Sequence, residues 1–157
     1  MKPWQDLLAF LLPHDTERFE DWARAVVRGE HCHAYLWSVK QGNGKSLLMR
    51  SVGRAVGAGY LEAGFAQLKW RPFMDKYSYV LFDELNMTAA RERQLLACIA
   101  DKTRAFGASG NSEASGIPNS FHATEEMLPQ DFYHVFGEWY DGCAYPLREY
   151  LLTEGVK

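Results

Sequence analysis

The stretch Gly42-Asn43-Gly44-Lys45-Ser46 constrains this chain more than any other, because it lies between an apolar run and a helical pattern. The run at 34–37 is typical of a strand, and apolar residues recur at helical spacing over 47–56. A glycine loop between a strand and a helix, closed by Lys-Ser, is typical of a site that cradles a nucleoside triphosphate. The pattern therefore predicts a nucleotide-binding loop at 38–46.

Each residue type in this loop has a physical role. Glycines let backbone N–H groups approach phosphates closely, and the N-terminus of the following helix adds partial positive charge. Lys45 is expected to reach the β- and γ-phosphates, and the Ser46 hydroxyl to ligate Mg²⁺. The general pattern has one more glycine, where this chain has Val39. We therefore expect Mg²⁺ and ATP at residues 42–46, Asn43 included, with one departure from the pattern.

A second motif follows at 77–84, where an apolar run ends in Asp83 and Glu84. A nearly continuous apolar run fits a strand buried on both faces of a parallel sheet, and open α/β sheets bind ligands at the carboxyl ends of their strands. Asp83 is expected to hold Mg²⁺ opposite Ser46, and Glu84 to orient and deprotonate the attacking water. The strands at 34–38 and 77–83 should then be neighbours or one strand apart.

The rest of the chain predicts further helices and one more strand. Residues 3–28 show two amphipathic patterns, separated at 13–15, and we expect them to form N-terminal helices. A helix is predicted over 89–100, an exposed flexible loop over the Gly-, Ser- and Asn-rich 107–116, and a strand from Ser120. The aromatic residues beyond 130 are expected to serve core and C-terminal packing.

Composition supports one globular domain. The chain has 157 residues, of which 47% are hydrophobic, and a net charge of −3. We expect a helical segment at 1–30 packed on a core at 31–157, within a single domain overall. No apolar run is long enough to cross a bilayer, and three widely spaced cysteines indicate reduced thiols in a cytoplasmic protein, in the host cell if the source is a phage.

A local basic segment is the one candidate for nucleic-acid contact. Lys102 and Arg104 lie next to Phe106, a combination of charge and aromatic surface that suits single strands. The alternative is a solvated turn without a ligand.

With the two motifs together, the chain resembles the superfamily 3 helicase domain of viral and phage primase-helicases and replication initiators. The similarity runs from about Trp22 to Pro129 and is anchored by 42–46, 79–84 and the helix and Gly-rich segment that follow. The resemblance implies a three-layer α/β P-loop NTPase fold of AAA-like type with a largely parallel sheet. It also implies ATP hydrolysis, a homo-oligomeric ring on single-stranded or forked DNA, and a primase or replication-initiator partner.

The resemblance also assigns roles to individual residues. It implies nucleotide binding by Gly42, Gly44, Lys45 and Ser46, acid roles for Asp83 and Glu84, and DNA contact around Lys102. In that family a later strand is followed by Thr-x-Asn, whose asparagine senses the γ-phosphate. In this chain Thr124 is followed instead by Glu125, an acid that would repel phosphate unless it is turned away.

An arginine from a neighbouring subunit commonly completes such sites by stabilising charge on the γ-phosphate. Downstream of Thr124 the sequence offers one arginine, Arg148. The alternative is a surface arginine paired with Glu149 or a nearby acid.

Three classes of function remain open from the sequence. The first is an ATP-dependent DNA-translocating ATPase, which the tandem acids Asp83-Glu84 favour. The second is a non-catalytic binding or regulatory protein that keeps the fold, which Glu125 and the short length favour over the first. The third is a P-loop kinase of small molecules, which the tandem acids disfavour because a kinase needs an acceptor pocket and no base for water.

Overall fold

The computed structural model describes residues 2–64, 75–100 and 104–153. In chain order its elements are α1 (Lys2–Leu11), α2 (Thr16–Val27), β1 (His33–Trp37), α3 (Lys45–Val56), a 3-10 turn (Gly57–Gly59), β2 (Tyr60–Glu62), β3 (Tyr79–Leu85), α4 (Ala89–Ala100), β4 (Ala105–Gly110), β5 (Ser120–His122), α5 (Gln130–Asp141) and α6 (Ala144–Thr153). The helices predicted before residue 30 and over 89–100, and the strand predicted from Ser120, are confirmed.

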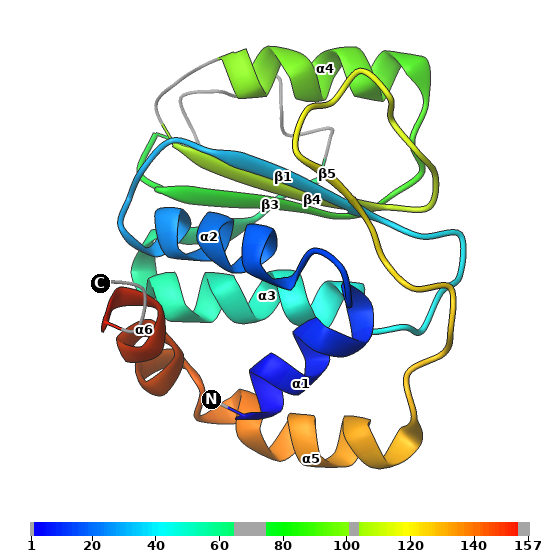
Figure 1. Cartoon of the computed structure of the whole chain (residues 1–157). Helices are drawn as coiled ribbons and strands as arrows, with labels where there is room; N and C mark the ends of the chain where they lie inside the picture. The colour runs from blue at the N-terminus through cyan, green and yellow to red at the C-terminus, as the bar shows by residue number, and fades with distance from the viewer. Residues whose placement is uncertain (1, 65–74, 101–103, 154–157) are drawn as a thin grey trace.

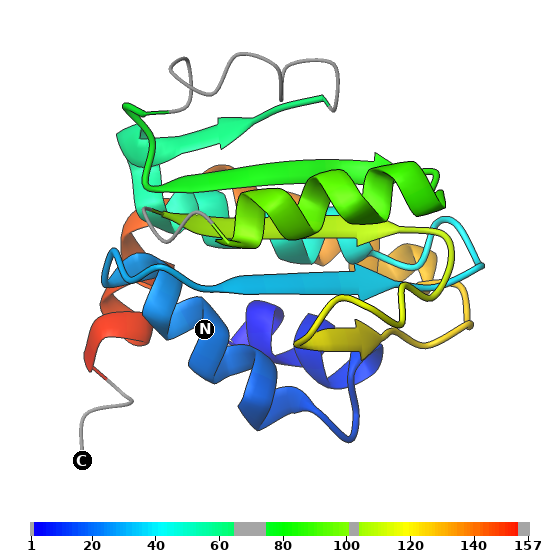
Figure 2. The same cartoon turned by 90° about the horizontal axis from the view of Figure 1, so that it is seen from above.

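The five strands form one parallel sheet in the order β2-β3-β4-β1-β5 (Figure 2). Strands β1 and β3 are therefore one strand apart, as predicted, with β4 between them. Because all strands run the same way, their carboxyl ends meet at one edge of the sheet, where α/β proteins bind ligands. The glycine loop after β1 and the acids of β3 both lie at this edge.

The helices cover both faces of the sheet, which confirms the three-layer α/β fold predicted from the sequence. Helix α4 covers one face, and α2 and α3 cover the other (Figure 1). Helices α1, α5 and α6 lie beyond α3, on its far side from the sheet (Figure 1).

Apolar residues form one core on each side of the sheet. The larger core contains the predicted inner faces of the first two helices, namely Trp4, Leu7, Leu8, Leu11, Leu12, Phe19, Trp22, Ala23, Val26 and Val27. The smaller core joins Leu95 and Cys98 of α4 to Val80, Phe82 and Phe106 of the sheet. The N-terminal helices therefore share one core with α3 and the sheet.

Strand β4 corrects one prediction. An exposed loop was expected over 107–116, but 105–110 is a fully buried strand between β3 and β1. Its small residues are required by large neighbours: a Cβ on Gly107 would lie 2.6 Å from Tyr79 Oη, and one on Gly110 would lie 2.2 Å from Tyr35 Oη. Glycine here indicates close packing and not a turn.

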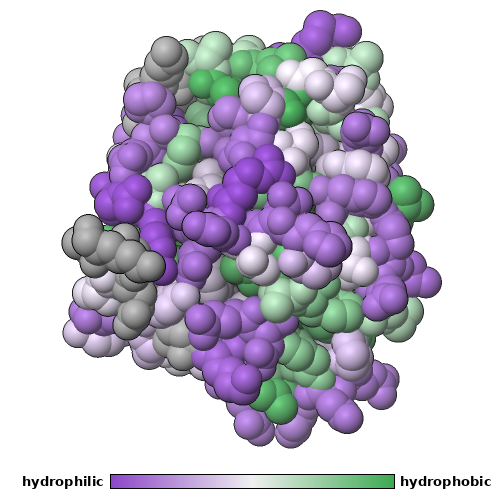
Figure 3. All heavy atoms as spheres, viewed as in Figure 1, coloured by the Kyte–Doolittle hydropathy of each residue, from purple (hydrophilic) through white to green (hydrophobic). Residues whose placement is uncertain are grey.

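The surface is mainly polar on the face shown in Figure 3, as expected when most apolar residues lie in the two cores. On the face shown in Figure 3, hydrophobic residues form small separate patches among polar ones. Among the residues that the structure describes, no helix combines the length and apolar character that a membrane span needs.

Candidate functional site

The glycine loop connects β1 to α3 and is closed on itself by Lys45. The Lys45 ammonium donates to Ser38 Oγ at 2.5 Å, to the Lys40 carbonyl at 3.0 Å and to Asn43 Oδ1 at 3.3 Å. Burial lowers the pKa of Lys45, and the carboxylates of Glu125, Asp83 and Glu84 oppose that shift. The loop thus surrounds a cation that is placed to meet an anion.

Two glycines are needed for the shape of this loop. Gly42 and Gly44 have φ values of +76° and +97°, which residues with a Cβ rarely adopt. A Cβ on Gly44 would also lie 3.0 Å from Leu7 of α1 and 3.2 Å from Leu128. Helix α1 therefore packs against the turn where α3 begins, and its leucines leave room for glycine alone.

The departure at Val39 does not disturb the loop. Residues 38–46 are all described, and within them only Gly42 and Gly44 have positive φ. The Val39 side chain is 70% exposed. Since neither backbone conformation nor space demands glycine at this position, valine is compatible with a closed loop.

Asp83 lies directly opposite Ser46, as predicted. The Ser46 hydroxyl donates to Asp83 Oδ1 at 2.9 Å, and the Ser109 hydroxyl of β4 donates to the same oxygen at 2.6 Å. Arg50, one turn further along α3, lies 3.0 Å from Asp83 Oδ2 and 2.8 Å from Glu62. The Asp83 side chain, only 8% exposed, is thus held by two hydroxyls and one guanidinium.

Glu84 lies within an irregular part of β3. The register of β3 against β4 shifts between Phe82 and Leu85, and Glu84 has a φ of +54°. Such bulges re-aim side chains, and positive φ at a residue with a Cβ stores strain. The Glu84 N–H donates to Ser109 Oγ at 2.9 Å, and its side chain lines the cavity above the loop.

The cavity at the carboxyl edge of the sheet encloses about 500 Å³, which is within the usual size of ligand pockets. It is lined by Ser38, the loop and helix residues 41–47, Glu84, Leu85, Asn86, Gly110, Asn111 and Tyr133. The residues predicted from the loop and Glu84 therefore meet around one space, with Asp83 hydrogen-bonded to Ser46 beside it.

Sequence reasoning missed Ser109 and Asn111, because β4, which carries Ser109 and ends directly before Asn111, was expected to be a loop. Strand β4 lies between β1 and β3, so its end meets the cavity between the glycine loop and the acids. Asn111 donates to Asn86 Oδ1 at 3.1 Å, while its own Oδ1 accepts the Met87 N–H at 3.3 Å. The available signal was the pair of polar residues at alternate positions, Ser109 and Asn111.

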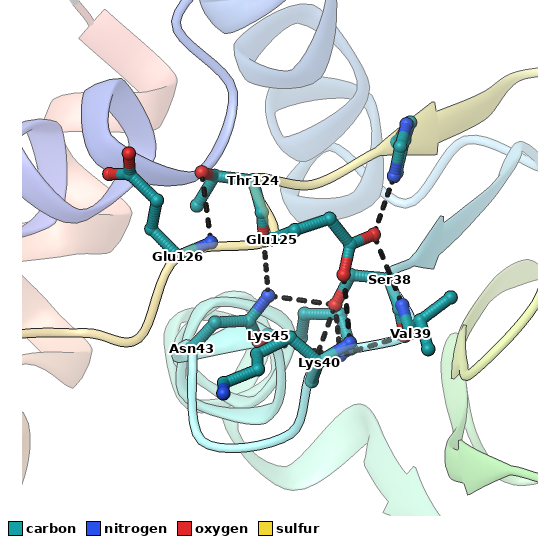
Figure 4. A network of polar contacts seen from close by, with 9 residues as sticks. Ser38, Val39, Lys40, Asn43, Lys45, Thr124, Glu125 and Glu126 are labelled. Atoms are coloured by element: carbon teal, nitrogen blue, oxygen red, sulfur yellow. Dashed lines mark hydrogen bonds and ion pairs between the residues drawn. The ribbon is translucent and has the colours of Figure 1, made fainter.

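Glu125, expected to repel phosphate unless turned away, is bound to the outside of the loop (Figure 4). Its carboxylate accepts the N–H groups of Val39 at 3.1 Å and Lys40 at 2.8 Å, and contacts His122 Nε2 at 2.7 Å. Burial raises the pKa of Glu125, but these hydrogen bonds together have the larger effect, and the pKa lies below its ordinary value. Glu125 is not one of the described residues that line the cavity.

The same segment fastens the loop at two more points. The Asn43 amide donates to the Thr124 carbonyl at 2.8 Å, and the Gly42 carbonyl accepts the Leu128 N–H at 3.3 Å and the Tyr133 hydroxyl at 3.0 Å (Figure 4 shows the first of these). The loop is therefore held from outside by the chain that follows β5.

The remaining predicted residues lie elsewhere. Lys102 is outside the described residues. Arg104 is buried at the opposite end of β4 and pairs with Asp75 at 3.0 Å, so the expectation that it forms an exposed basic contact is wrong. Arg148 is exposed on α6 and donates to the Ala55 carbonyl at 3.4 Å, near the end of α3 that is distant from the loop. Within its own chain Arg148 does not reach the cavity.

The fold has counterparts among solved structures. The C-terminal region of NrS-1, in an A-form apo structure, aligns with a TM-score of 0.71 at 17% identity over 100% of this chain and 46% of that chain. A second structure of that region aligns with a TM-score of 0.62 at 16% identity, over 92% of this chain and 44% of that one. This chain thus spans about half the length of the structures it matches.

Other comparisons add little. A Cytophaga hutchinsonii protein, provisionally named an ATPase, aligns with a TM-score of 0.49 at 14% identity over 94% of this chain and 61% of that one, which supports no inference. No protein-family model and no curated protein matches the sequence. What the likenesses and the geometry establish is an α/β fold with a parallel sheet and a glycine loop between β1 and α3.

Proposed function

We propose that this chain binds Mg²⁺ and ATP at the glycine loop and hydrolyses the γ-phosphate bond. The observation that carries the proposal is the 2.9 Å contact between Ser46 and Asp83 beside a cavity that also receives Lys45 and Glu84. A hydroxyl and a carboxylate at the N-terminus of α3, with an ammonium beside them, match the needs of a triphosphate and its cation.

The loop residues supply binding. The backbone N–H groups at 42–46 and the N-terminus of α3 favour negative charge, and Lys45 can exchange its bonds to loop oxygens for bonds to phosphate. That exchange removes the Lys45 ammonium from three neutral acceptors and pairs it with an anion. The contribution of Lys45 to the free energy of nucleotide binding should therefore be large and depend on its charge.

The oxygens of Ser46 and Asp83 fit Mg²⁺, which prefers oxygen ligands and retains waters beside phosphates. When bound, the ion would neutralise charge on the β- and γ-phosphates. Ser109 orients the Asp83 carboxylate toward Ser46, and Arg50 fixes its second oxygen. In this proposal Glu84 is the base for the attacking water, and Asn111, which lines the same cavity, holds that water or the phosphate.

Thermal unfolding tests the binding step. Mg-ATP at about 100 times its Kd should stabilise the protein by about 2.7 kcal/mol, which is roughly 5–10 °C in Tm for a domain of this size. Lys45→Ala should remove most of this shift, whereas Lys76→Ala, at an exposed site next to β3, should retain it. An equal shift in the Lys45 variant would refute the assigned role of Lys45.

Phosphate release tests the chemical step. Glu84→Gln keeps the shape of the side chain and removes the base, so ATP should bind while turnover falls about a hundredfold or more. Turnover that Glu84→Gln leaves unchanged would exclude Glu84 as the base.

The second candidate is nucleotide binding without turnover. It is favoured by Arg50, whose guanidinium already occupies one oxygen of Asp83 and would compete with the metal ion for it. The absence of phosphate release by the unsubstituted protein, with Mg-ATP and single-stranded DNA present, would favour this candidate.

Action on DNA as a superfamily 3-like helicase, in a homo-oligomeric ring and with a primase or replication-initiator partner, is the wider proposal. It is supported by the motif resemblance and by the P-loop ATPase-like fold. Single-strand affinity should fall with salt, and Lys102→Ala should reduce that salt dependence by about one phosphate contact. An unchanged salt slope would remove Lys102 from the DNA contact.

A further inference from the structure

Tyr133 differs from every other aromatic residue in the described part of the chain, because it alone lines the cavity above the glycine loop. It projects from α5, and its hydroxyl donates to the Gly42 carbonyl at 3.0 Å. The side chain is nevertheless 38% exposed, whereas most large apolar side chains of this protein are buried. Its ring is thus fixed in orientation and open to a ligand.

The arrangement of the site determines which part of a nucleotide would meet this ring. In the proposed function, Ser46, Asp83 and Glu84 define the γ-phosphate end of the ligand, and they lie at the edge of the sheet. Helix α5 lies on the far side of α3 from the sheet (Figure 1). A triphosphate whose γ end points toward β3 must therefore extend its nucleoside end away from the sheet, toward α5 and Tyr133.

The polar side chains of the cavity are poorly placed to recognise a base by hydrogen bonds. The Asn43 amide donates to Ser38 Oγ at 2.7 Å and to the Thr124 carbonyl at 2.8 Å. Asn86 and Asn111 bond to one another at 3.1 Å. The remaining amide of the lining, Gln41, belongs to the loop that cradles the phosphates. Contact with the face of the base is the interaction that the exposed ring of Tyr133 offers.

We propose that Tyr133 is the base-binding residue of this site and stacks on the nucleobase of the bound nucleotide. The inference rests on the proposed function and adds to it a mode of base selection. Stacking on an aromatic ring accepts every base, because every base has a π-face. Purine nucleotides should therefore bind more tightly than pyrimidine nucleotides, in proportion to ring area, with ATP and GTP nearly equal.

Inorganic tripolyphosphate separates the two ends of the ligand. The experiment measures the Kd of ATP and of tripolyphosphate, each with Mg²⁺, for the full chain and for Tyr133→Ala. Removal of one base–aromatic stack should weaken ATP binding between about fivefold and about a hundredfold, and leave tripolyphosphate binding within about twofold. Tyr133→Phe keeps the ring without the bond to Gly42, and should bind ATP more tightly than Tyr133→Ala.

Tyr145→Ala is the matched control, because Tyr145 is 71% exposed on α6 and does not line the cavity. It should bind both ligands as the unsubstituted chain does. Equal weakening of ATP and tripolyphosphate by Tyr133→Ala would overturn the stacking role and show that Tyr133 only supports the loop. If the unsubstituted protein bound neither ligand, the proposed function would fail, and the base-binding role with it.

Discussion

Replacement of Glu84 by glycine should make the protein more stable while it abolishes the proposed chemistry. Glu84 has a φ of +54° within β3, and its carboxylate has no role in the core because the residue is exposed. A left-handed conformation costs a residue with a Cβ about 1–2 kcal/mol, which glycine avoids. Glycine's greater freedom in the unfolded chain reduces this stabilisation by about 0.4–1 kcal/mol. Glu84→Gly should thus exceed Glu84→Ala in stability by about 1 kcal/mol.

The comparison with alanine matters because both variants lose the carboxylate. Any electrostatic effect of the missing acid on Asp83 or Lys45 is common to the two, and only the backbone cost differs. For a chain of 157 residues the expected difference is about 2–4 °C in Tm. Thermal and urea unfolding of both variants, in the absence of nucleotide, measure it.

Glu126 provides the matched control for this experiment. It is exposed and close to the loop, but positive φ among the described non-glycine residues is confined to Glu84 and Asn119. At Glu126 the order should reverse, with alanine more stable than glycine by about 0.4–1 kcal/mol. If glycine were no more stable than alanine at Glu84, the conclusion that the backbone is strained there would be refuted.

Three further predictions concern packing, pH and assembly. Gly110→Ala should destabilise by about 1–3 kcal/mol because its Cβ would displace Tyr35, whereas Gly137→Ala, in open space within α5, should stabilise by about 0.5–1 kcal/mol; urea unfolding checks both signs. The pKa of Glu125 is lower in the folded state, so its contribution is complete above its ordinary pKa of 4.5 and is lost on acidification below it; Glu125→Gln should therefore lose less stability than the unsubstituted chain between neutral and acidic pH, and equal losses would contradict this. If Arg148 acts on a neighbouring subunit, turnover per chain should rise with protein concentration and Arg148→Ala should bind ATP without hydrolysing it, whereas a fully active variant would return Arg148 to the surface.

The glycine loop, the acid strand and the inner faces of the helices were predictable because their signals are local. Gly42, Gly44, Lys45 and Ser46 carry the loop pattern within five residues, and the run before Asp83 is continuous. Their juxtaposition also followed, since the carboxyl ends of parallel strands share one edge of the sheet.

Strand β4 was not predictable from local signals, because its composition answers to residues far away. Gly107 and Gly110 are small since Tyr79 and Tyr35 of the adjacent strands occupy the space that a side chain would fill. Read without those neighbours, the same residues indicate a turn. The error concealed Asn111, which follows this strand, from the candidate site.

The contacts of Glu125 and Tyr133 were not predictable for a related reason. The direction of the Glu125 side chain is determined by its hydrogen bonds to the N–H groups of Val39 and Lys40, which lie 86 and 85 residues away in the sequence. The residues next to Glu125 therefore do not show that the acid is turned away from phosphate. Tyr133 lies in a segment of aromatic residues, and its exposure, its place in the cavity and its bond to Gly42 distinguish it from those that fill the core. Such pairings are properties of the folded chain.

The attachment of the loop to the chain after β5 has a consequence for synthesis. The partner that holds Asn43 is Thr124, 81 residues later, and both strands that flank β1 also follow it by many residues. A ribosome adds about 5–20 residues per second, so a nascent chain carries the phosphate cradle for several seconds before its supports exist. During that interval β1 has two open edges and the loop has unpaired N–H groups. We therefore expect ATP to be unable to assist early folding, and to stabilise the native fold only after the segment that follows β5 has been synthesised.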